Sequence, residues 1–139
     1  MKSFKSPYLI DFLKLGAPDV GYISVTEGAS TYVPFEIKRA FWTYYTPESV
    51  VRGRHAHKAT EQVLIAVSGI ILVTVENANG KTEIFKLDRP SLGLYIPPHF
   101  WHTMQFSHNA VQMVFASTLY REDDYLRTKE AFLNYWGQR

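Results

Sequence analysis

The chain of 139 residues contains no cysteine, which excludes disulfide bonds and thiolate metal sites and suits a reducing compartment. No stretch approaches the ~20 apolar residues that a membrane-spanning helix needs. No apolar run follows the first residues, Met-Lys-Ser-Phe-Lys-Ser-Pro, as it would in a signal peptide. We therefore expect a cytoplasmic protein.

Charged residues are few and show no strong excess of one sign. They make up 20% of the chain, and the formal net charge is +2. Lys and Arg form no basic run, so the sequence argues against a nucleic-acid partner as well as against disorder. Hydrophobic residues make up 46%, enough for one core at this length. We expect a single domain over residues 1–139, with no membrane partner.

Short β-branched and aromatic runs alternate with turn residues through most of the chain. The runs lie at 22–26, 37–45, 62–67, 70–76, 82–87, 93–96, 102–106 and 110–117. Many short, evenly spaced strands are typical of a sandwich or barrel, and Asn79-Gly80 between two runs predicts a tight hairpin. From Glu122 to Trp136 the apolar residues recur at roughly helical spacing, and Asp123 and Asp124 lie where they would cap a helix. The sequence predicts an all-β barrel followed by one C-terminal α-helix.

Two neighbouring histidines are the sharpest candidate site. Strand alternation in Arg52-Gly53-Arg54-His55-Ala56-His57 projects His55 and His57 to one face and Ala56 to the other. Gly53 lets the backbone bend or approach a ligand closely. Paired imidazoles suit either metal binding or proton transfer near neutral pH. This segment alone also allows two surface histidines on an exposed strand.

A second segment, from Gly93 to His102, extends this pattern. The first cupin motif has His-x-His followed by Glu and then Gly, and the second has Gly followed by Pro-x-Gly-x-x-His. The matching residues here are His55, His57, Gly69, Gly93, Pro97 and His102, with His99 in place of the second-motif Gly. The two segments thus resemble the paired motifs of the cupin superfamily. The resemblance implies a cupin (RmlC-like jelly-roll) β-barrel in which the three histidines share one cavity.

Metal-dependent cupins bind their ion with three His and one Glu. Counting back from Gly69, the Glu position falls on Gln62, while Glu61 is one residue away and would face the opposite side of a strand. A neutral amide is a poor replacement for a carboxylate on a divalent metal, so we expect no metal at this site.

A closer resemblance covers nearly the whole chain from Val20 onward. It runs through Phe35-Glu36-Ile37-Lys38-Arg39, Arg52-Gly53-Arg54-His55-Ala56-His57-Lys58, Glu61-Gln62-Val63-Leu64, Ser68-Gly69, Gly93-Leu94-Tyr95-Ile96, Trp101-His102, Ala116-Ser117 and a tail with Tyr120, Glu122, Asp124, Tyr125, Leu126 and Arg127. This order resembles the dTDP-4-keto-6-deoxyglucose 3,4-ketoisomerases of the WxcM-like cupin family. Arg-Gly-x-His-Ala-His-Lys together with Gly-Leu-Tyr-Ile is specific to them, whereas Arg-Gly-x-His also occurs in dTDP-sugar 3,5-epimerases.

The resemblance implies a dTDP-linked 4-keto-6-deoxy sugar as substrate and the dTDP-3-keto-6-deoxyhexose as product. Such a product feeds the biosynthesis of 3-amino-3,6-dideoxy sugars for bacterial glycans such as O-antigens and S-layer glycans. The resemblance also implies no cofactor and a homodimer with swapped N-terminal strands. The chemistry removes a proton from C3, passes through an enediolate and returns a proton to C4. We assign His55 as the base and His57 as the proton shuttle between O3 and O4, although these two roles could be reversed.

The other candidate residues would bind the substrate. Arg52 and Arg39 could each hold a phosphate or enediolate oxygen, although Arg39 could equally be a surface charge. Gln62 could hydrogen-bond a sugar hydroxyl, and His102 completes the histidine set. Four aromatic residues could wall the sugar or stack on thymine, or else pack in the core: Trp42, Tyr44, Tyr95 and Trp101.

Two positions differ from the family pattern, namely Val20 and Gln105. Because they could influence which face of C4 receives the proton, the product's C4 configuration, gluco or galacto, stays open. Two alternative functions also stay open: a metal-dependent cupin enzyme and a non-catalytic cupin that binds a nucleotide sugar.

Overall fold

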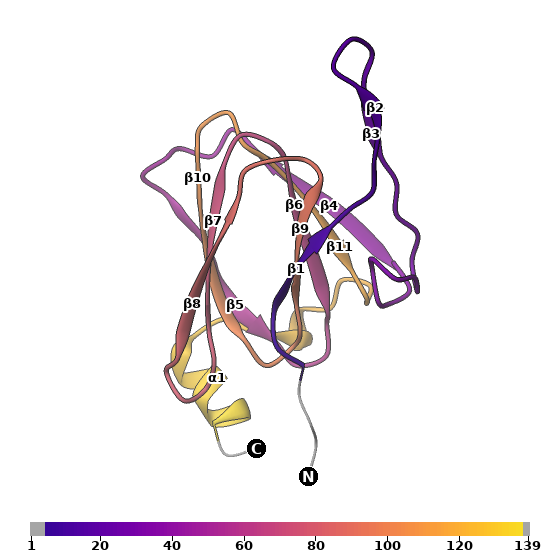
Figure 1. Cartoon of the computed structure of the whole chain (residues 1–139). Coiled ribbons are helices and arrows are strands. Elements are labelled where there is room, and N and C mark those ends of the chain that lie inside the picture. The colour runs from indigo at the N-terminus through magenta and orange to yellow at the C-terminus, as the bar shows by residue number, and fades with distance from the viewer. Residues whose placement is uncertain (1–4, 138–139) are drawn as a thin grey trace.

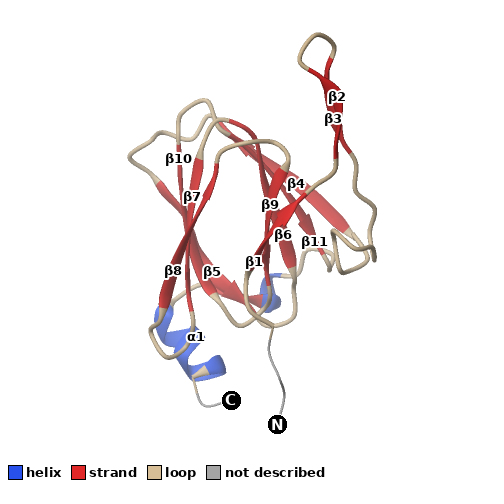
Figure 2. Ribbon diagram, viewed as in Figure 1, coloured by secondary structure: helices blue, strands red, loops and turns tan. Residues whose placement is uncertain are grey.

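Two five-stranded antiparallel sheets face each other in a jelly roll (Figures 1 and 2). The structure is a computed structural model that describes residues 5–137. One sheet has the order β1-β9-β6-β11-β4 and the other β12-β5-β10-β7-β8. Their bounds are β1 (Tyr8–Asp11), β4 (Arg39–Tyr44), β5 (Val51–His57), β6 (Gln62–Ser68), β7 (Ile71–Glu76), β8 (Thr82–Leu87), β9 (Leu92–Ile96), β10 (Trp101–Phe106), β11 (Val111–Ala116) and β12 (Tyr125–Leu126). The predicted all-β jelly roll is confirmed.

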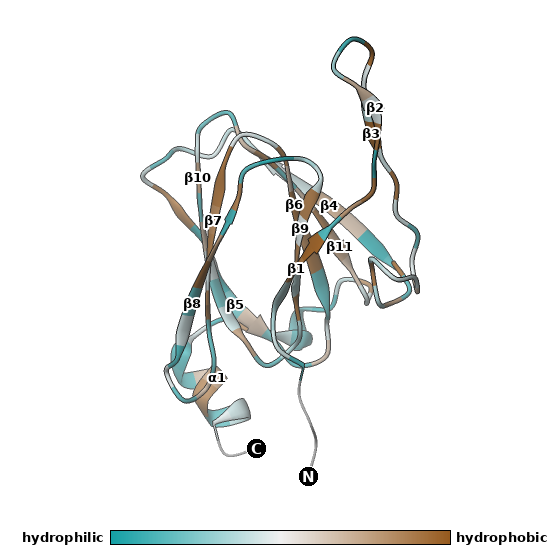
Figure 3. Cartoon of the chain, viewed as in Figure 1, coloured by the Kyte–Doolittle hydropathy of each residue, from teal (hydrophilic) through white to brown (hydrophobic). Residues whose placement is uncertain are grey.

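Alternate residues of these strands fill the space between the sheets. Leu64, Val73 and Leu94 are almost completely buried there, together with Met104 and Val114. Because side chains alternate across a strand, each strand also presents a second row to the outside. Figure 3 shows hydrophobic residues along β1 and β7, as strands that line a core require. Burial of this apolar row stabilises the barrel and makes each strand's inward face unambiguous.

The C-terminal helix is shorter than predicted. Helix α1 spans Lys129–Trp136, and its N-cap is Thr128, whose side chain accepts a hydrogen bond from the backbone N–H of Ala131. The expectation that Asp123 and Asp124 cap a helix is therefore wrong. These residues belong to a 3₁₀ turn, Glu122–Asp124, which leads into β12 because Tyr125 and Leu126 pair with the edge of β5.

Helix α1 covers the outer face of the second sheet. Phe132 is fully buried in a cluster with Ala56 and Leu126, and Trp101 packs against it with a ring separation of 6.0 Å. This packing stabilises β5 from behind, on the face opposite the histidines. No helix in residues 5–137 is long and apolar enough to cross a membrane.

An N-terminal hairpin projects from the barrel at the end opposite α1 (Figure 1). It consists of β2 (Lys14–Ala17) and β3 (Gly21–Ser24), which pair with each other and with no other strand in the described part of the chain. The run at 22–26 predicts a strand near β3, but no predicted run corresponds to β1 or β2. The hairpin exposes large apolar residues, since Leu15, Val20 and Ile23 are 51%, 80% and 65% exposed.

Candidate active site

Three imidazoles from two adjacent strands meet inside the barrel. His55 and His57 come from β5, and His102 on β10 lies opposite His55 in the strand register. The ring centroid of His55 is 5.1 Å from that of His57 and 4.6 Å from that of His102. One nitrogen from each ring lies within 4.8 Å of the others. The alternation inferred from the sequence thus brings these side chains together, while Ala56 faces α1.

A bulge in β5 sets the position of Arg52. The register shifts between the pairs His102–His55 and Thr103–Gly53, so Arg54 is the extra residue. Gly53 and Arg54 both have positive φ, 86° and 56°. Without the bulge, Arg52 would lie on the face opposite His55. With it, Arg52 lies opposite the interior residue Met104, on the histidine side of the strand, with its side chain exposed.

Burial keeps two of the imidazoles uncharged. Burial and the neighbouring His57 lower the pKa of His55 from 6.5 to about 4. Burial, together with His55 and His57, also places the pKa of His102 well below its ordinary value. His55 Nδ1 lies 3.0 Å from the Gly53 carbonyl oxygen. Because a carbonyl only accepts, Nδ1 of a neutral His55 donates, and its Nε2 has a free lone pair.

His57 has a carboxylate partner. Its Nδ1 lies 2.9 Å from Oδ2 of Asp124, while its Nε2 is buried with no hydrogen-bond partner among residues 5–137. Asp124 also accepts hydrogen bonds from the Ala59 backbone N–H and the Thr60 hydroxyl. Burial alone would raise the pKa of Asp124, but these hydrogen bonds hold it below its ordinary value. Asp124 is therefore ionised at neutral pH.

The segment around β12 covers the imidazoles with aromatic rings. The ring of Tyr125 lies 4.5 Å from that of His57 and 5.2 Å from that of His55. Tyr120 stacks obliquely on Tyr125 at 5.7 Å, and the Arg127 guanidinium lies 4.2 Å from the Tyr125 ring. Such flat, partly polar walls suit a sugar or nucleotide ligand.

Arg39 and Gln62 lie on the interior face of the first sheet. Their register partners place them in one row across three strands, with Ala116 between them. Gln62 is buried, and Arg39 has a buried Nε with no hydrogen-bond partner in the described part of the chain. The Arg39 guanidinium lies 5.7 Å from the ring of Tyr120, which links it through Tyr125 to the histidines. An unsatisfied guanidinium nitrogen inside the barrel is suited to an anionic ligand.

The four aromatic candidates lie elsewhere. Trp42 and Tyr44 are exposed on the outer row of β4, whose inner row is half-buried. Tyr95 is buried outside the barrel, where Phe12 and Phe35 pack around it. Trp101 faces α1. The structure does not bring these residues to the imidazoles, because strand alternation turns each of them to the outer face of its sheet.

The two positions that differ from the family pattern also lie apart from the histidines. Val20 is in the turn of the β2–β3 hairpin, and Gln105 is exposed on β10.

The donor set of a metal-dependent cupin is incomplete here. His55, His57 and His102 offer three nitrogen ligands, but Gln62 occupies the inward position next to them in the motif. The Glu61 carboxylate instead accepts a hydrogen bond from Tyr95 on the outer side. The residues present therefore do not match a set of three His and one carboxylate.

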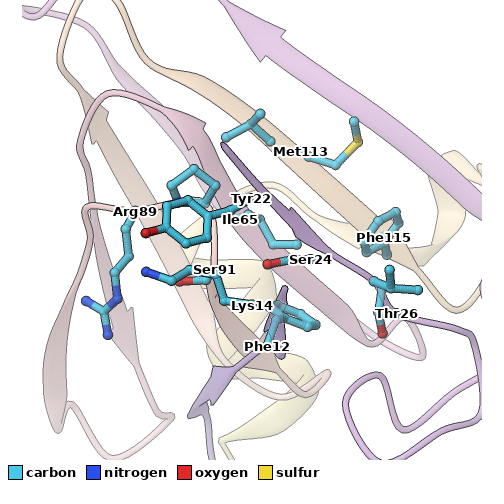
Figure 4. A pocket seen from close by; sticks show the side chains of 13 residues that line it. Phe12, Lys14, Tyr22, Ser24, Thr26, Ile65, Arg89, Ser91, Met113 and Phe115 are labelled. Atoms are coloured by element: carbon cyan, nitrogen blue, oxygen red, sulfur yellow. The ribbon is translucent and has the colours of Figure 1, made fainter. Parts of the chain in front are cut away.

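A cavity of about 620 Å³ lies outside the barrel, between the β2–β3 hairpin and the outer face of the first sheet (Figure 4). Phe12, Ile65 and Phe115 are among the apolar side chains that line it, and the cationic side chains of Lys14 and Arg89 also line it. It contains none of the histidines, so it is separate from the candidate active site.

An antiparallel jelly roll whose interior carries three clustered histidines, one of them hydrogen-bonded to a partly buried carboxylate, defines a protein of the cupin class. The chain matches the family described as "FdtA: WxcM-like, C-terminal" over residues 5–137. The chain belongs to this family.

Known relatives agree with this assignment. TDP-4-oxo-6-deoxy-alpha-D-glucose-3,4-oxoisomerase of Aneurinibacillus thermoaerophilus is 38% identical over 128 residues, covering 91% of this chain and 90% of that protein. The sugar 3,4-ketoisomerase QdtA of Thermoanaerobacterium thermosaccharolyticum, in complex with TDP, is 32% identical and superposes with a TM-score of 0.89 over 96% of each chain. A histidine-to-asparagine mutant of QdtA in complex with TDP-4-keto-6-deoxyglucose gives a TM-score of 0.90 at 30% identity, covering 99% and 98% of the two chains.

The sequence does not predict a role in the site for Asp124, Tyr125 or Thr60. Asp124 and Tyr125 belong to the tail that resembles the family, but the apolar spacing of this tail predicts a helix from Glu122 onward. The pairing of β12 with β5 brings Asp124 to His57, and the interior row of β4 brings Arg39 to Tyr120. A sequence alone does not show these contacts.

Proposed function

We infer that the chain is a sugar nucleotide 3,4-ketoisomerase, and we propose that His55 and His57 carry out its proton transfers. The isomerase class follows from the family and from the relatives of the same name. The observation that supports the roles of the two histidines is their position as adjacent imidazoles inside the barrel, His57 buried and His55 partly buried, with Nε2 of His57 unpaired among residues 5–137.

The proposed substrate is TDP-4-keto-6-deoxyglucose, the ligand in the QdtA mutant structure. Its C4 carbonyl acidifies the hydrogen on C3. His55 takes that proton, and the electrons of the C3–H bond form a C3–C4 double bond, which leaves a negative charge on O4. The low pKa of His55 keeps the ring neutral at pH 7, the form that a general base needs.

The intermediate must then exchange its hydroxyl and its oxyanion. Nε2 of His57 removes the proton from O3 and delivers it to O4, and His55 returns its proton to C4. The product is the 3-keto sugar, and no atom or electron is gained or lost. Arg39 and Arg52 are proposed to hold the diphosphate or an enediolate oxygen, and Gln62 and His102 to hydrogen-bond the sugar.

The second part of the proposal is a homodimer that exchanges N-terminal strands. The β2–β3 hairpin exposes Leu15 and Ile23, and it lies beside a cavity lined by apolar side chains. Exposed apolar surface of this kind favours a protein partner, and a second copy of this chain is the partner that we propose.

Product analysis tests the reaction itself. TDP-4-keto-6-deoxyglucose incubated with the purified protein should give carbon NMR signals of a ketone at C3 and a hydroxyl-bearing C4. The configuration at C4 can be read from the same spectrum. If the substrate stays unchanged, the isomerase proposal is wrong, and the alternative of a non-catalytic cupin that binds nucleotide sugars is favoured.

A metal-dependent enzyme is the second candidate, because the three clustered imidazoles offer nitrogen ligands that can bind Zn²⁺. We expect activity to survive exhaustive chelation, since the carboxylate ligand of metal cupins is replaced by Gln62. The measurement is turnover before and after dialysis against EDTA, with added divalent ions. Loss of turnover that one ion restores would favour the metal-dependent enzyme.

A further inference from the structure

The C-terminal segment joins the edge of the barrel directly beside His57. Residues Tyr125 and Leu126 pair with His57 and Ala56 as a two-residue strand, and the backbone N–H of Lys58 donates to the carbonyl oxygen of Asp124. This pairing brings the Asp124 side chain from 67 positions away to the imidazole of His57. Nothing in the strand pattern of β5 by itself supplies a carboxylate at this place.

We infer that Asp124 is a positioning residue that fixes the tautomer of His57, and this inference rests on the proposed role of His57 as the proton shuttle. An ionised carboxylate can only accept hydrogen bonds. At 2.9 Å from Oδ2 of Asp124, Nδ1 of His57 must therefore carry the hydrogen. Whenever the ring carries a single hydrogen, its lone pair is then on Nε2.

Nε2, the other nitrogen of the His57 ring, is available to a ligand. The His57 side chain is only 3% exposed, and its Nε2 has no hydrogen-bond partner among residues 5–137. The neighbouring rings of His55 and His102 contribute no hydrogen bond to it in the described structure. A buried unpaired nitrogen is costly, so its retention fits a place for a ligand hydroxyl.

The carboxylate itself is held in one orientation. The backbone N–H of Ala59 donates to Oδ1 at 2.7 Å, and the hydroxyl of Thr60 donates to Oδ2. These bonds keep Asp124 from turning away or taking up the proton. When Nε2 takes the proton from O3, the ring becomes cationic, and the fixed negative charge stabilises it until the proton passes to O4.

Replacing Asp124 with Asn tests this inference against a matched control. An amide can donate to Nδ1 of His57 and stabilise the wrong tautomer, a change that lowers kcat about 10⁴-fold in triad hydrolases. We expect Asp124→Asn to lower kcat by about 10²–10⁴-fold with little change in KM. Asp123→Asn removes the adjacent carboxylate, which is exposed and paired with Arg121, and should retain wild-type kcat.

A second readout separates positioning from a merely structural role. If His55 is the base, the Asp124→Asn enzyme should still exchange the C3 hydrogen of unreacted substrate with deuterated water. Exchange per turnover should therefore rise, because the shuttle is impaired more than the base. A fall of exchange and turnover by the same factor, with a matching loss of stability, would overturn the inference.

The tautomer itself can be observed without any substrate. In ¹⁵N NMR of the wild-type protein at neutral pH, His57 should carry its hydrogen on Nδ1, and this signature should be lost in Asp124→Asn. A wild-type His57 protonated on Nε2 would overturn the inference, even if Asp124→Asn fails to fold. If the wild-type and Asp123→Asn proteins both lack isomerase activity, the proposed function fails while the NMR result still decides the role of Asp124.

Discussion

At the scale of single residues, the three clustered histidines are distinguished by what their Nδ1 atoms contact. His55 faces the carbonyl oxygen of Gly53, His102 faces that of Phe100 at 3.4 Å, and only His57 faces a carboxylate. A carbonyl dipole orients a ring without stabilising a full charge as strongly as an ionised acid does. This difference supports separate roles for His55 as base and His57 as shuttle.

The partly buried His55 should make the free energy of unfolding depend on pH. The pKa of His55 is about 4 in the folded protein and 6.5 by ordinary reference, because burial disfavours the charged ring. Between these values the unfolded chain binds a proton that the folded protein does not. Stability is thus complete above pH 6.5 and falls as the pH drops toward 4, by on the order of 3 kcal/mol for this group.

Urea unfolding between pH 4.5 and 7.5 measures this dependence. The free energy of unfolding of the wild-type protein should fall with decreasing pH, and His55→Asn should flatten part of the slope. His108→Asn, at an exposed position, is the control and should keep the wild-type slope. Equal slopes in wild-type and His55→Asn proteins would contradict the described burial of His55.

At the scale of elements, the bulge in β5 is a local device with a direct effect on the site. A Cβ at Gly53 would approach the carbonyl oxygen of His102 to 3.0 Å and the Met104 side chain to 2.8 Å, at a φ of +86°. Gly53 also supplies the carbonyl that faces His55. A side chain at this position would therefore disturb both the strand and the base.

Gly80 provides a matched control, because it has the same φ of +86° and no heavy atom within 4 Å of a built Cβ. We expect Gly80→Ala to lower the free energy of unfolding by about 1–2 kcal/mol, from the backbone conformation alone. Gly53→Ala should cost about 1–3 kcal/mol more through overpacking, and should also lower activity. Urea unfolding of both variants makes the comparison, and equal losses would show that the bulge tolerates a side chain.

Strands were more predictable from the sequence than the tail was. Runs such as 62–67 and 70–76 carry β-branched residues between turn signals, and their strands form as predicted. The pair His55 and His57 follows simple alternation. The helix-cap prediction for Asp124 is wrong for a physical reason. Acidic residues favour a helix start, but Asp124 instead hydrogen-bonds His57 and Ala59, which are more than 60 positions away in the sequence.

The aromatic candidates show a second limit of sequence reasoning. Both faces of the first sheet are partly apolar, so composition does not say which face of β4 or β9 is interior. The register settles it: Arg39 and Gln62 face inward, while Trp42 and Tyr95 face outward. The bulge brings Arg52 to the inner face, and Gly53 is the one residue in the sequence that indicates it.

At the scale of the whole molecule, the projecting hairpin predicts association. The chain has a mass of 16.0 kDa, so a homodimer should sediment at about twice that mass at micromolar concentration. Ile23→Glu, at a position 65% exposed in the described chain, should shift the equilibrium to monomer. Glu83→Gln on the edge strand β8 is the control, and a wild-type protein at the monomer mass would contradict the prediction.

In the proposed account, catalysis takes place inside the barrel and association takes place outside it. The histidines lie on β5 and β10, whereas the hairpin and the cavity of about 620 Å³ adjoin the outer face of the other sheet. Substitutions at the histidines should therefore alter the turnover rate, and substitutions in the hairpin should alter the sedimentation mass.

The most direct test of the account is hydrogen exchange at C3 of TDP-4-keto-6-deoxyglucose in deuterated water, measured with TDP binding. Replacing His55 or His57 with Asn removes an acid–base group and should lower turnover by about 10²–10⁴-fold, while TDP affinity changes little. His55→Asn should also abolish exchange at C3, whereas His57→Asn should retain exchange and lose turnover. If both variants exchange the C3 hydrogen at the wild-type rate, neither imidazole is the base, and the proposed mechanism is wrong.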